Sequence, residues 1–239
     1  MKFCLFFFTI LSSIACLGQN LTAKQILDKS IAYHDPNGNW ETFDGEFTVM
    51  MTTPNASKRI SVIKIDLLSE YFSVTATRDT VTTAYTIDRD KCIMAYNGKV
   101  LDSVKADEKK MSCDRANLYK NYYTYLYGLP MKLNDPGTNL SETVENKTFN
   151  GKGYLVLKAT YDEAVGSDVW YFYFNTKTYA MEVYQFFKTD ENGREKSDSG
   201  EYIVLSEEAL VNGIKMPKVR AWYYNKDDKY LGTDTLVGN

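Results

Sequence analysis

The stretch YKNYYTYLYGLPMKLNDPGT, residues 119–138, indicates how the rest of the chain is arranged. Its first half has the spacing of an amphipathic helix that is rich in tyrosine. The helix must stop abruptly, because Gly128 suits a left-handed cap and Pro130 cannot continue helical hydrogen bonding. Asp135-Pro136-Gly137 then favours a turn. One face of this helix is therefore expected to lie on an apolar surface.

The same helix is predicted to begin well before this stretch and to cover residues 105–127. At 100° per residue, the apolar and aromatic side chains share one broad arc and the polar side chains lie opposite. We expect the helix to act as a lid whose inward side includes Leu118, Tyr122 and Leu126. The full arc is Met111, Leu118, Tyr119, Tyr122, Tyr123, Tyr125 and Leu126, and the opposite side is Asn117, Lys120, Asn121 and Thr124.

Strands are predicted on both sides of the long helix. Before it, residues 43–52 alternate between apolar and polar positions, which is typical of a half-buried antiparallel strand. Asn97-Gly98, between two apolar runs, is the strongest hairpin signal in the chain. Near the N-terminus, Thr22 and Gln25 have the spacing of a capping box that opens a short helix, and that helix should end before Pro36.

The second half returns to strands joined by turn residues. Trp170, Phe172 and Phe174 alternate with Tyr171 and Tyr173, so the purely apolar rings and the tyrosines should face opposite sides of the sheet. This pattern predicts an α+β fold that is mainly antiparallel β, a strongly curved half-barrel sheet covered by a few helices. One side of the sheet should be closed and the other partly wet.

The N-terminus is predicted to be a secretory signal peptide. A lysine precedes an apolar run from Phe3 to Leu11, which is too short for a membrane span, and small residues follow it. Cleavage after Gly18 would leave residues 19–239 as one domain, exported and either periplasmic or associated with the outer membrane. The alternative is a lipoprotein anchored through Cys16, but Ser13 stands where such signals usually carry leucine.

The mature chain would retain two cysteines, Cys92 and Cys113. An even pair in an oxidising compartment predicts a disulfide that closes a loop of about 20 residues. Two buried free thiols are the alternative.

Motifs for common enzyme chemistry are missing from the sequence. The single histidine, His34, has no second histidine or cysteine pair at metal-ligand spacing, so we interpret it as a surface or capping residue. Nucleotide-binding and serine-hydrolase signatures are also missing, and no cofactor is expected. A formal charge of -3 without a basic cluster argues against nucleic-acid partners. The carboxylate pairs Asp227-Asp228 and Glu207-Glu208 are interpreted as solvated strand ends.

Several short motifs spread along the chain resemble an uncharacterised family of exported bacterial proteins. That family in turn is similar to the LolA/LolB-type lipoprotein-carrier superfamily, and the resemblance implies a curved antiparallel half-barrel covered by helices, with a concave side that takes acyl chains. The motifs are Tyr122-Tyr123, residues 126–131, Asp135-Pro136-Gly137-Thr138, residues 170–173, Lys177-Thr178, Gly200-Glu201-Tyr202, Lys215-Met216-Pro217 and residues 230–234.

The leading functional hypothesis is a non-catalytic binding protein of the bacterial cell envelope. Its concave face would hold an acyl chain or another apolar ligand against Trp170, Phe172, Phe174 and Phe186, beneath Leu118, Tyr122 and Leu126 of the helix. The first alternative is an envelope structural or interaction protein with a filled core and no ligand. The second is an enzyme that uses carboxylates, which would require two of them in the main cleft.

Overall fold

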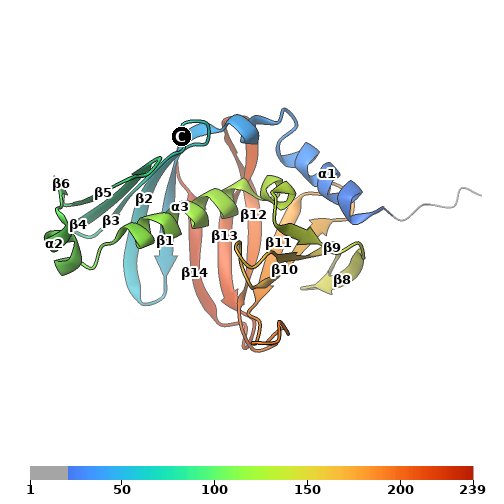
Figure 1. The fold of residues 1–239 in the computed structure, drawn as a ribbon. Coiled ribbons are helices and arrows are strands. Elements are labelled where there is room, and N and C mark those ends of the chain that lie inside the picture. The colour runs from blue at the N-terminus through green and yellow to red at the C-terminus, as the bar shows by residue number, and fades with distance from the viewer. Residues whose placement is uncertain (1–20, 239) are drawn as a thin grey trace, which may run out of the picture.

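The computed structural model describes residues 21–238, which form one 14-stranded sheet and three α-helices (Figure 1). The first half contains α1 (Ala23–His34), the 3-10 helix η1 (Asn39–Thr42), β1 (Asp44–Thr53), β2 (Ala56–Asp66), β3 (Tyr71–Arg78), β4 (Val81–Asp88), β5 (Lys91–Tyr96), β6 (Lys99–Val100), α2 (Ser103–Glu108) and α3 (Cys113–Gly128). The second half contains η2 (Met131–Asn134), β7 (Thr138–Leu140), β8 (Glu145–Phe149), β9 (Lys152–Tyr161), β10 (Val169–Asn175), β11 (Met181–Phe187), β12 (Glu201–Val211), β13 (Ile214–Tyr224) and β14 (Tyr230–Leu236).

The sheet joins the two halves of the chain through its first and last long strands. The strand order is β6-β5-β4-β3-β2-β1-β14-β13-β12-β11-β10-β9-β7, and β8 pairs with β9 beside this path. β1 and β14 are antiparallel, with Val49 opposite Leu236. Each half is therefore a meander of neighbouring strands, and the pairing of β1 with β14 makes them one surface.

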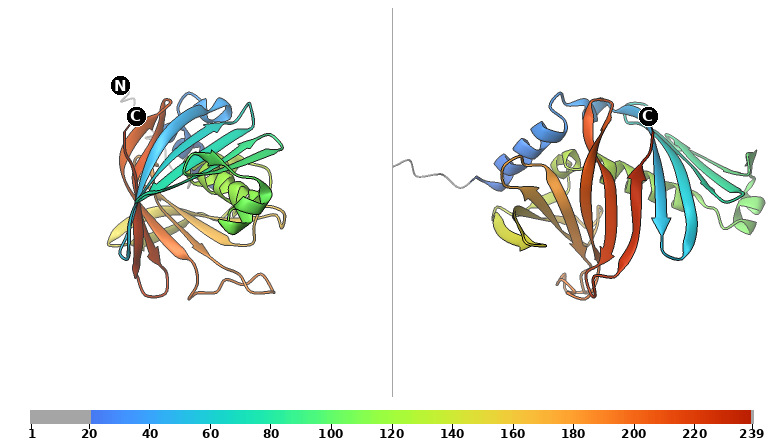
Figure 2. Two further views of the ribbon diagram at one scale, coloured as in Figure 1. Left: turned by 90° about the vertical axis from the view of Figure 1, so that its left-hand side faces the viewer. Right: turned by 180° about the vertical axis from the view of Figure 1, so that it is seen from behind.

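This surface curves strongly around α3, as the end-on view in Figure 2 shows. All its strand pairs are antiparallel, and α3 lies along the concave side across β1, β14 and β13 (Figure 1). The predicted fold class, a curved and mainly antiparallel sheet covered by a few helices, is confirmed. Residues 1–18 and Cys16 lie outside the described residues, so the signal peptide, its alternative anchor and the single domain over 19–239 stay predictions.

The two faces of the sheet have separate cores. The concave core contains Phe172 and Phe174 together with residues of α3, whereas Tyr171 and Tyr173 belong to a smaller cluster on the convex side. The predicted alternation along β10 is therefore correct. The prediction of a partly wet outer side is wrong at this strand, because Phe149 of β8 packs against the convex tyrosines and leaves them 5–9% exposed.

The predicted long helix is wrong in one respect, because it is two helices. The break follows Lys110, which has a left-handed backbone (φ 55°), and the Met111 N–H bonds back to the Ala106 carbonyl oxygen. Ser112 then caps α3, since its hydroxyl oxygen accepts a hydrogen bond from the Arg115 N–H at 3.2 Å. Apolar spacing alone cannot show such an internal cap. The predicted capping box of Thr22 and Gln25 in α1 is confirmed.

The inward face of α3 also differs from the projection. Leu118, predicted to point inward, is 66% exposed, whereas Tyr127 is 1% exposed. Ala116, Tyr123 and Tyr127 supply the buried stripe, and their spacing of seven and four residues follows the helix repeat. Leu118 is two positions after Ala116, about 200° around the helix, so it faces away from the buried stripe.

Gly128 has a different role from the predicted left-handed cap. It is the last residue of α3 and has no positive φ. A Cβ atom built at Gly128 would collide with the Trp40 ring of η1, so glycine is needed here for a close approach. The helix ends instead at Leu129, which has extended backbone angles and precedes a cis peptide bond to Pro130.

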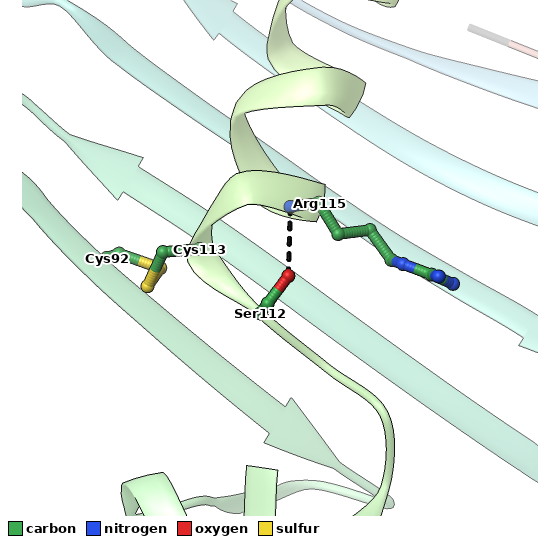
Figure 3. The surroundings of a disulfide bond; sticks show 4 residues. All are labelled: Cys92, Ser112, Cys113 and Arg115. Carbon is green, nitrogen blue, oxygen red and sulfur yellow. Dashed lines mark hydrogen bonds between the residues drawn. A yellow bond between two sulfur atoms is a disulfide. The ribbon is translucent and has the colours of Figure 1, made fainter. Parts of the chain in front are cut away.

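A disulfide joins the other end of α3 to the sheet. Cys92 lies on β5 and Cys113 is the first residue of α3, with their Cα atoms 5.9 Å apart (Figure 3). The helix that covers the concave side is therefore covalently held at its start and packed against Trp40 at its end.

Candidate functional site

A cavity of about 920 Å³ lies between the C-terminal half of α3 and the second half of the sheet. One wall is α3, and the other is formed by the concave side of β10 to β13. Residues 135–138 and 164–168 border it. Its volume is near the upper end of the range for small-molecule sites, about 300–1,000 Å³.

Five of the seven residues predicted to bind a ligand line this cavity. They are Leu118, Tyr122, Leu126, Trp170 and Phe186. The other two, Phe172 and Phe174, are fully buried in the concave core and do not reach it. The difference follows from their position along β10, because Trp170 lies at the start of the strand near residues 164–168, and each step of two residues moves about 7 Å away.

Sequence reasoning missed three aromatic residues of the cavity. They are Tyr125, which the helix arc includes without a role, and Tyr161 and Trp222, which no sequence motif singles out. Alternation does place Trp222 on one face of β13, but no local signal shows that β13 lies next to the helix. That neighbourhood comes from the long-range strand order.

The aromatic rings of the cavity support one another. Trp170 stacks on Phe186 with ring centroids 4.8 Å apart, and Tyr125 meets Trp170 edge-on at 5.6 Å. Tyr122 and Trp222 lie nearly parallel at 6.2 Å. Rings held at these distances by several neighbours form rigid walls. A ligand would therefore meet a preformed apolar surface.

Hydroxyl groups are also present in this wall. The hydroxyls of Tyr125 and Tyr161 are hydrogen-bonded to each other. Burial raises the pKa of Tyr161 to about 12, so its hydroxyl stays protonated at neutral pH. Only one of the two hydroxyl hydrogens is used in this bond, so the other can donate to a polar atom of a ligand.

Charged groups lie around the edge of the cavity. Lys132 and Asp135 form an ion pair with each other. Burial raises the pKa of both Asp168 and Glu201, and the positive charge of Lys188 partly offsets this in each case. Asp168 and Glu201 both line the cavity, as does Asp135.

A second depression, of about 280 Å³, lies beside the end of α1 and the turn between β10 and β11 and includes His34. The prediction that His34 is a surface or capping residue is wrong, because its side chain is 2% exposed. Its Nε2 atom accepts a hydrogen bond from the Met181 N–H at 3.0 Å, so Nδ1 carries the proton and donates to the Lys215 carbonyl oxygen at 2.7 Å. His34 therefore joins α1 to β11 and β13.

This arrangement predicts a loss of stability on acidification. Burial lowers the pKa of His34 below its ordinary value of 6.5, so the folded chain resists the protonation that the unfolded chain accepts. The stabilisation is complete above pH 6.5 and is lost as the pH falls from there through the lower folded-state pKa. Urea unfolding of wild type and His34→Gln at several pH values tests this.

At neutral pH, His34→Gln should cost about 1–3 kcal/mol, because buried partners lose their hydrogen bonds. Below pH 6.5, the free energy of unfolding of the variant should also fall less steeply with pH than that of the wild type. Equal slopes for the two proteins would contradict the role of His34.

Residues 21–238 contain no group of three or more histidine, cysteine, aspartate or glutamate side chains placed to hold a metal ion. Over the same range, no helix has the length and apolar character needed to cross a membrane.

Comparison with known proteins places the chain in a family. A family model described as a family of unknown function, DUF6503, matches residues 1–239. The chain belongs to the DUF6503 family. The expectation of an uncharacterised family is thereby confirmed. No curated protein matches this DUF6503 protein.

Among solved structures, the DUF6503 chain is similar to a DUF1329 family protein from Desulfovibrio piger ATCC 29098. The two are 8% identical, the likeness covers 90% of this chain and 91% of that chain, and the TM-score is 0.46. At this level the likeness carries no argument about function.

Proposed function

We propose that this protein is a non-catalytic binding protein that holds an apolar ligand, such as an acyl chain, between α3 and the concave side of the sheet. The cavity of about 920 Å³ is the observation that carries the proposal. Each methylene moved from water onto its aromatic walls would contribute about 0.8 kcal/mol. A ligand with several methylenes would thus bind without any specific polar contact.

The cavity also bears on the alternative of an interaction protein with a filled core. Such a protein would have packed the space between the helix and the sheet with its own side chains. Here Phe172 and Phe174 do fill the core, but Trp170, Phe186 and Trp222 border open space. The observation favours a ligand.

The resemblance to LolA/LolB-type carriers supports the same ligand class, and the predicted signal peptide supports a place in the cell envelope. We therefore propose that the protein is exported and works in the periplasm or at the outer membrane. Two measurements would locate it: whether protease added to intact cells cleaves the protein, and whether osmotic shock releases it. Recovery only from the cytoplasm would overturn this part of the proposal.

Ligand binding can be measured directly. Trp170 and Trp222 line the cavity, so an apolar ligand should change tryptophan emission as the delipidated protein is titrated with hexadecanol. Native mass spectrometry of the freshly purified protein should show a co-purified apolar molecule that organic extraction removes. If the extracted protein binds no hexadecanol, hexadecanoic acid or phospholipid, the proposal fails.

A substitution at Leu118 can change binding without changing stability, because Leu118 borders the cavity yet is 66% exposed. Leu118→Glu should leave stability nearly unchanged and weaken hexadecanol binding about tenfold, since a charged group replaces apolar contact area. Titration by tryptophan emission measures the change.

The matched control is Leu68→Glu, because Leu68 is 73% exposed and does not line the cavity. It should bind hexadecanol like wild type. Equal affinities for the two variants would show that binding occurs elsewhere.

A carboxylate-based activity is the second candidate, because Asp168 and Glu201 share the cavity and burial raises the pKa of each. Raised values of this kind suit a general acid. Hydrolysis of chromogenic glycosides and esters by wild type and by Asp168→Asn/Glu201→Gln distinguishes the two functions. Hydrolysis faster than background with the wild type, but not with the double variant, would favour the enzyme.

A further inference from the structure

Arg220 on β13 is a buried charge without an ion-pair partner. Its side chain is 1% exposed, and its guanidinium carbon lies 3.9 Å from the centroid of the Tyr127 ring. One N–H, on Nη1, donates to the Pro217 carbonyl oxygen at 2.8 Å, but Nε has no hydrogen-bond partner. None of the ion pairs formed within residues 21–238 includes Arg220. Buried guanidinium groups are normally paired, because removing the charge from water is costly.

Two tyrosine hydroxyls near Arg220 are unsatisfied as well. The hydroxyls of Tyr127 and Tyr184 are buried and have no hydrogen-bond partner. Arg220 lies over the Tyr127 ring, and the Tyr184 ring centroid is 6.3 Å from that of Trp222, which is two residues from Arg220 on β13. Unsatisfied buried hydroxyls are uncommon, since each forfeits its hydrogen bond to water. A guanidinium group and two hydroxyls thus meet beneath α3, and neither hydroxyl hydrogen has an acceptor there.

The nearest carboxylate does not remove this imbalance. Asp234 is opposite Arg220 in the β13–β14 register and is 5% exposed. Its Oδ2 atom accepts a hydrogen bond from the Tyr122 hydroxyl at 3.4 Å. Burial raises the pKa of Asp234, and the charges of both Arg220 and Arg59 oppose the rise. Two guanidinium groups therefore share one carboxylate, and the Nε of Arg59 is also buried without a partner.

This group of donors lies directly behind the cavity wall. Trp222 borders the cavity and is two residues from Arg220, on the same face of β13 and about 7 Å along the strand. Tyr122 also borders the cavity, and its hydroxyl contacts Asp234. Figure 1 shows α3 crossing β14 and β13.

We propose that the ligand is an amphiphile ending in an oxyanion, a carboxylate or a phosphate, which binds Arg220 and the hydroxyls of Tyr127 and Tyr184. The apolar part of the ligand would remain in the aromatic cavity, and Tyr122 would turn aside to admit the head. When Arg220 binds the ligand, the positive charge of Arg59 would still offset the negative charge of Asp234. The inference rests on the proposed binding function and adds the chemical class of the head group.

The test compares three probes with the same chain, namely hexadecanol, hexadecanoic acid and hexadecyl phosphate, on the delipidated full chain. Wild type should bind at least one of the two anions about tenfold or more tightly than the alcohol, because charge-assisted hydrogen bonds form only with the anion. The better anion identifies whether a carboxylate or a phosphate is preferred.

The decisive variant is Tyr127→Phe/Tyr184→Phe. Neither hydroxyl has a hydrogen-bond partner within the protein, so removing both should not lower the unfolding temperature. The preference for the anion over the alcohol should fall, while alcohol binding persists. Tyr173→Phe is the control, since its hydroxyl lies on the convex side and donates to Gln185 at 2.8 Å.

Arg220→Met should abolish the preference for the anion. If this variant does not fold, the tyrosine variant still decides. Equal affinity of wild type for all three probes, or a preference unchanged in the tyrosine variant, would overturn the inference and indicate that only water occupies the polar group. Failure of every probe to bind would instead refute the proposed function itself.

Discussion

Replacing Phe172 with alanine is expected to lower the free energy of unfolding by about 3–5 kcal/mol. Phe172 is 0% exposed and lies in the concave core, opposite Leu157 on β9 and Tyr184 on β11. The alanine variant would lose the transfer free energy of the ring and leave a void that the surrounding strands cannot close. Urea unfolding followed by circular dichroism measures the change.

The same position separates a core role from a ligand-binding role. Phe172→Leu keeps most of the volume and should cost much less, with hexadecanol affinity unchanged. Leu118→Glu should show the reverse pattern, with lost affinity and retained stability. Should Phe172→Leu bind hexadecanol many-fold more weakly at nearly wild-type stability, Phe172 would have to be reassigned to the ligand site.

Removing the disulfide is expected to cost about 3 kcal/mol of stability in the Cys92→Ser/Cys113→Ser variant. The bond closes a loop with a sequence separation of 21 residues, and its loss frees that loop in the unfolded chain. Denaturant unfolding should show the drop for the variant and for wild type with reductant. Reductant should have no effect on the variant.

The disulfide also determines which part of the lid loosens first. Cys113 begins α3 and is joined to β5, whereas the end of α3 packs against Trp40 and the cavity. Amide hydrogen exchange in the double variant should therefore rise in the first turns of α3 more than around Tyr127. Uniform exchange along α3 would show that the bond does not act locally.

Much of the fold was readable from local patterns. Alternation along residues 170–174 and the turn at Asn97-Gly98 depend on neighbours within a few residues, and both predictions are correct. The break after Lys110 was not readable, because a left-handed residue followed by a serine cap leaves the apolar spacing almost intact. The capping signal at Ser112 was present but was hidden inside an apparently continuous pattern.

The candidate site was readable only in part, for a similar reason. Residue type indicated Trp170 and Phe186, but not that Phe172, on the same face of the same strand, would be covered. His34 likewise appeared isolated in the sequence, although its ring connects to Met181 and Lys215 in distant strands. Burial depends on what packs above a face, and alternation describes only which face is used.

The sequence by itself determined the strands, their faces, the helix caps near Thr22 and an aromatic helix that must cover something. Tertiary structure alone decided that β1 pairs with β14, that Trp222 and Tyr122 share one cavity, and that Arg220 lies unpaired behind them. Local propensity follows from interactions within a few residues, whereas a cavity and a buried charge exist only where segments far apart in the chain come together.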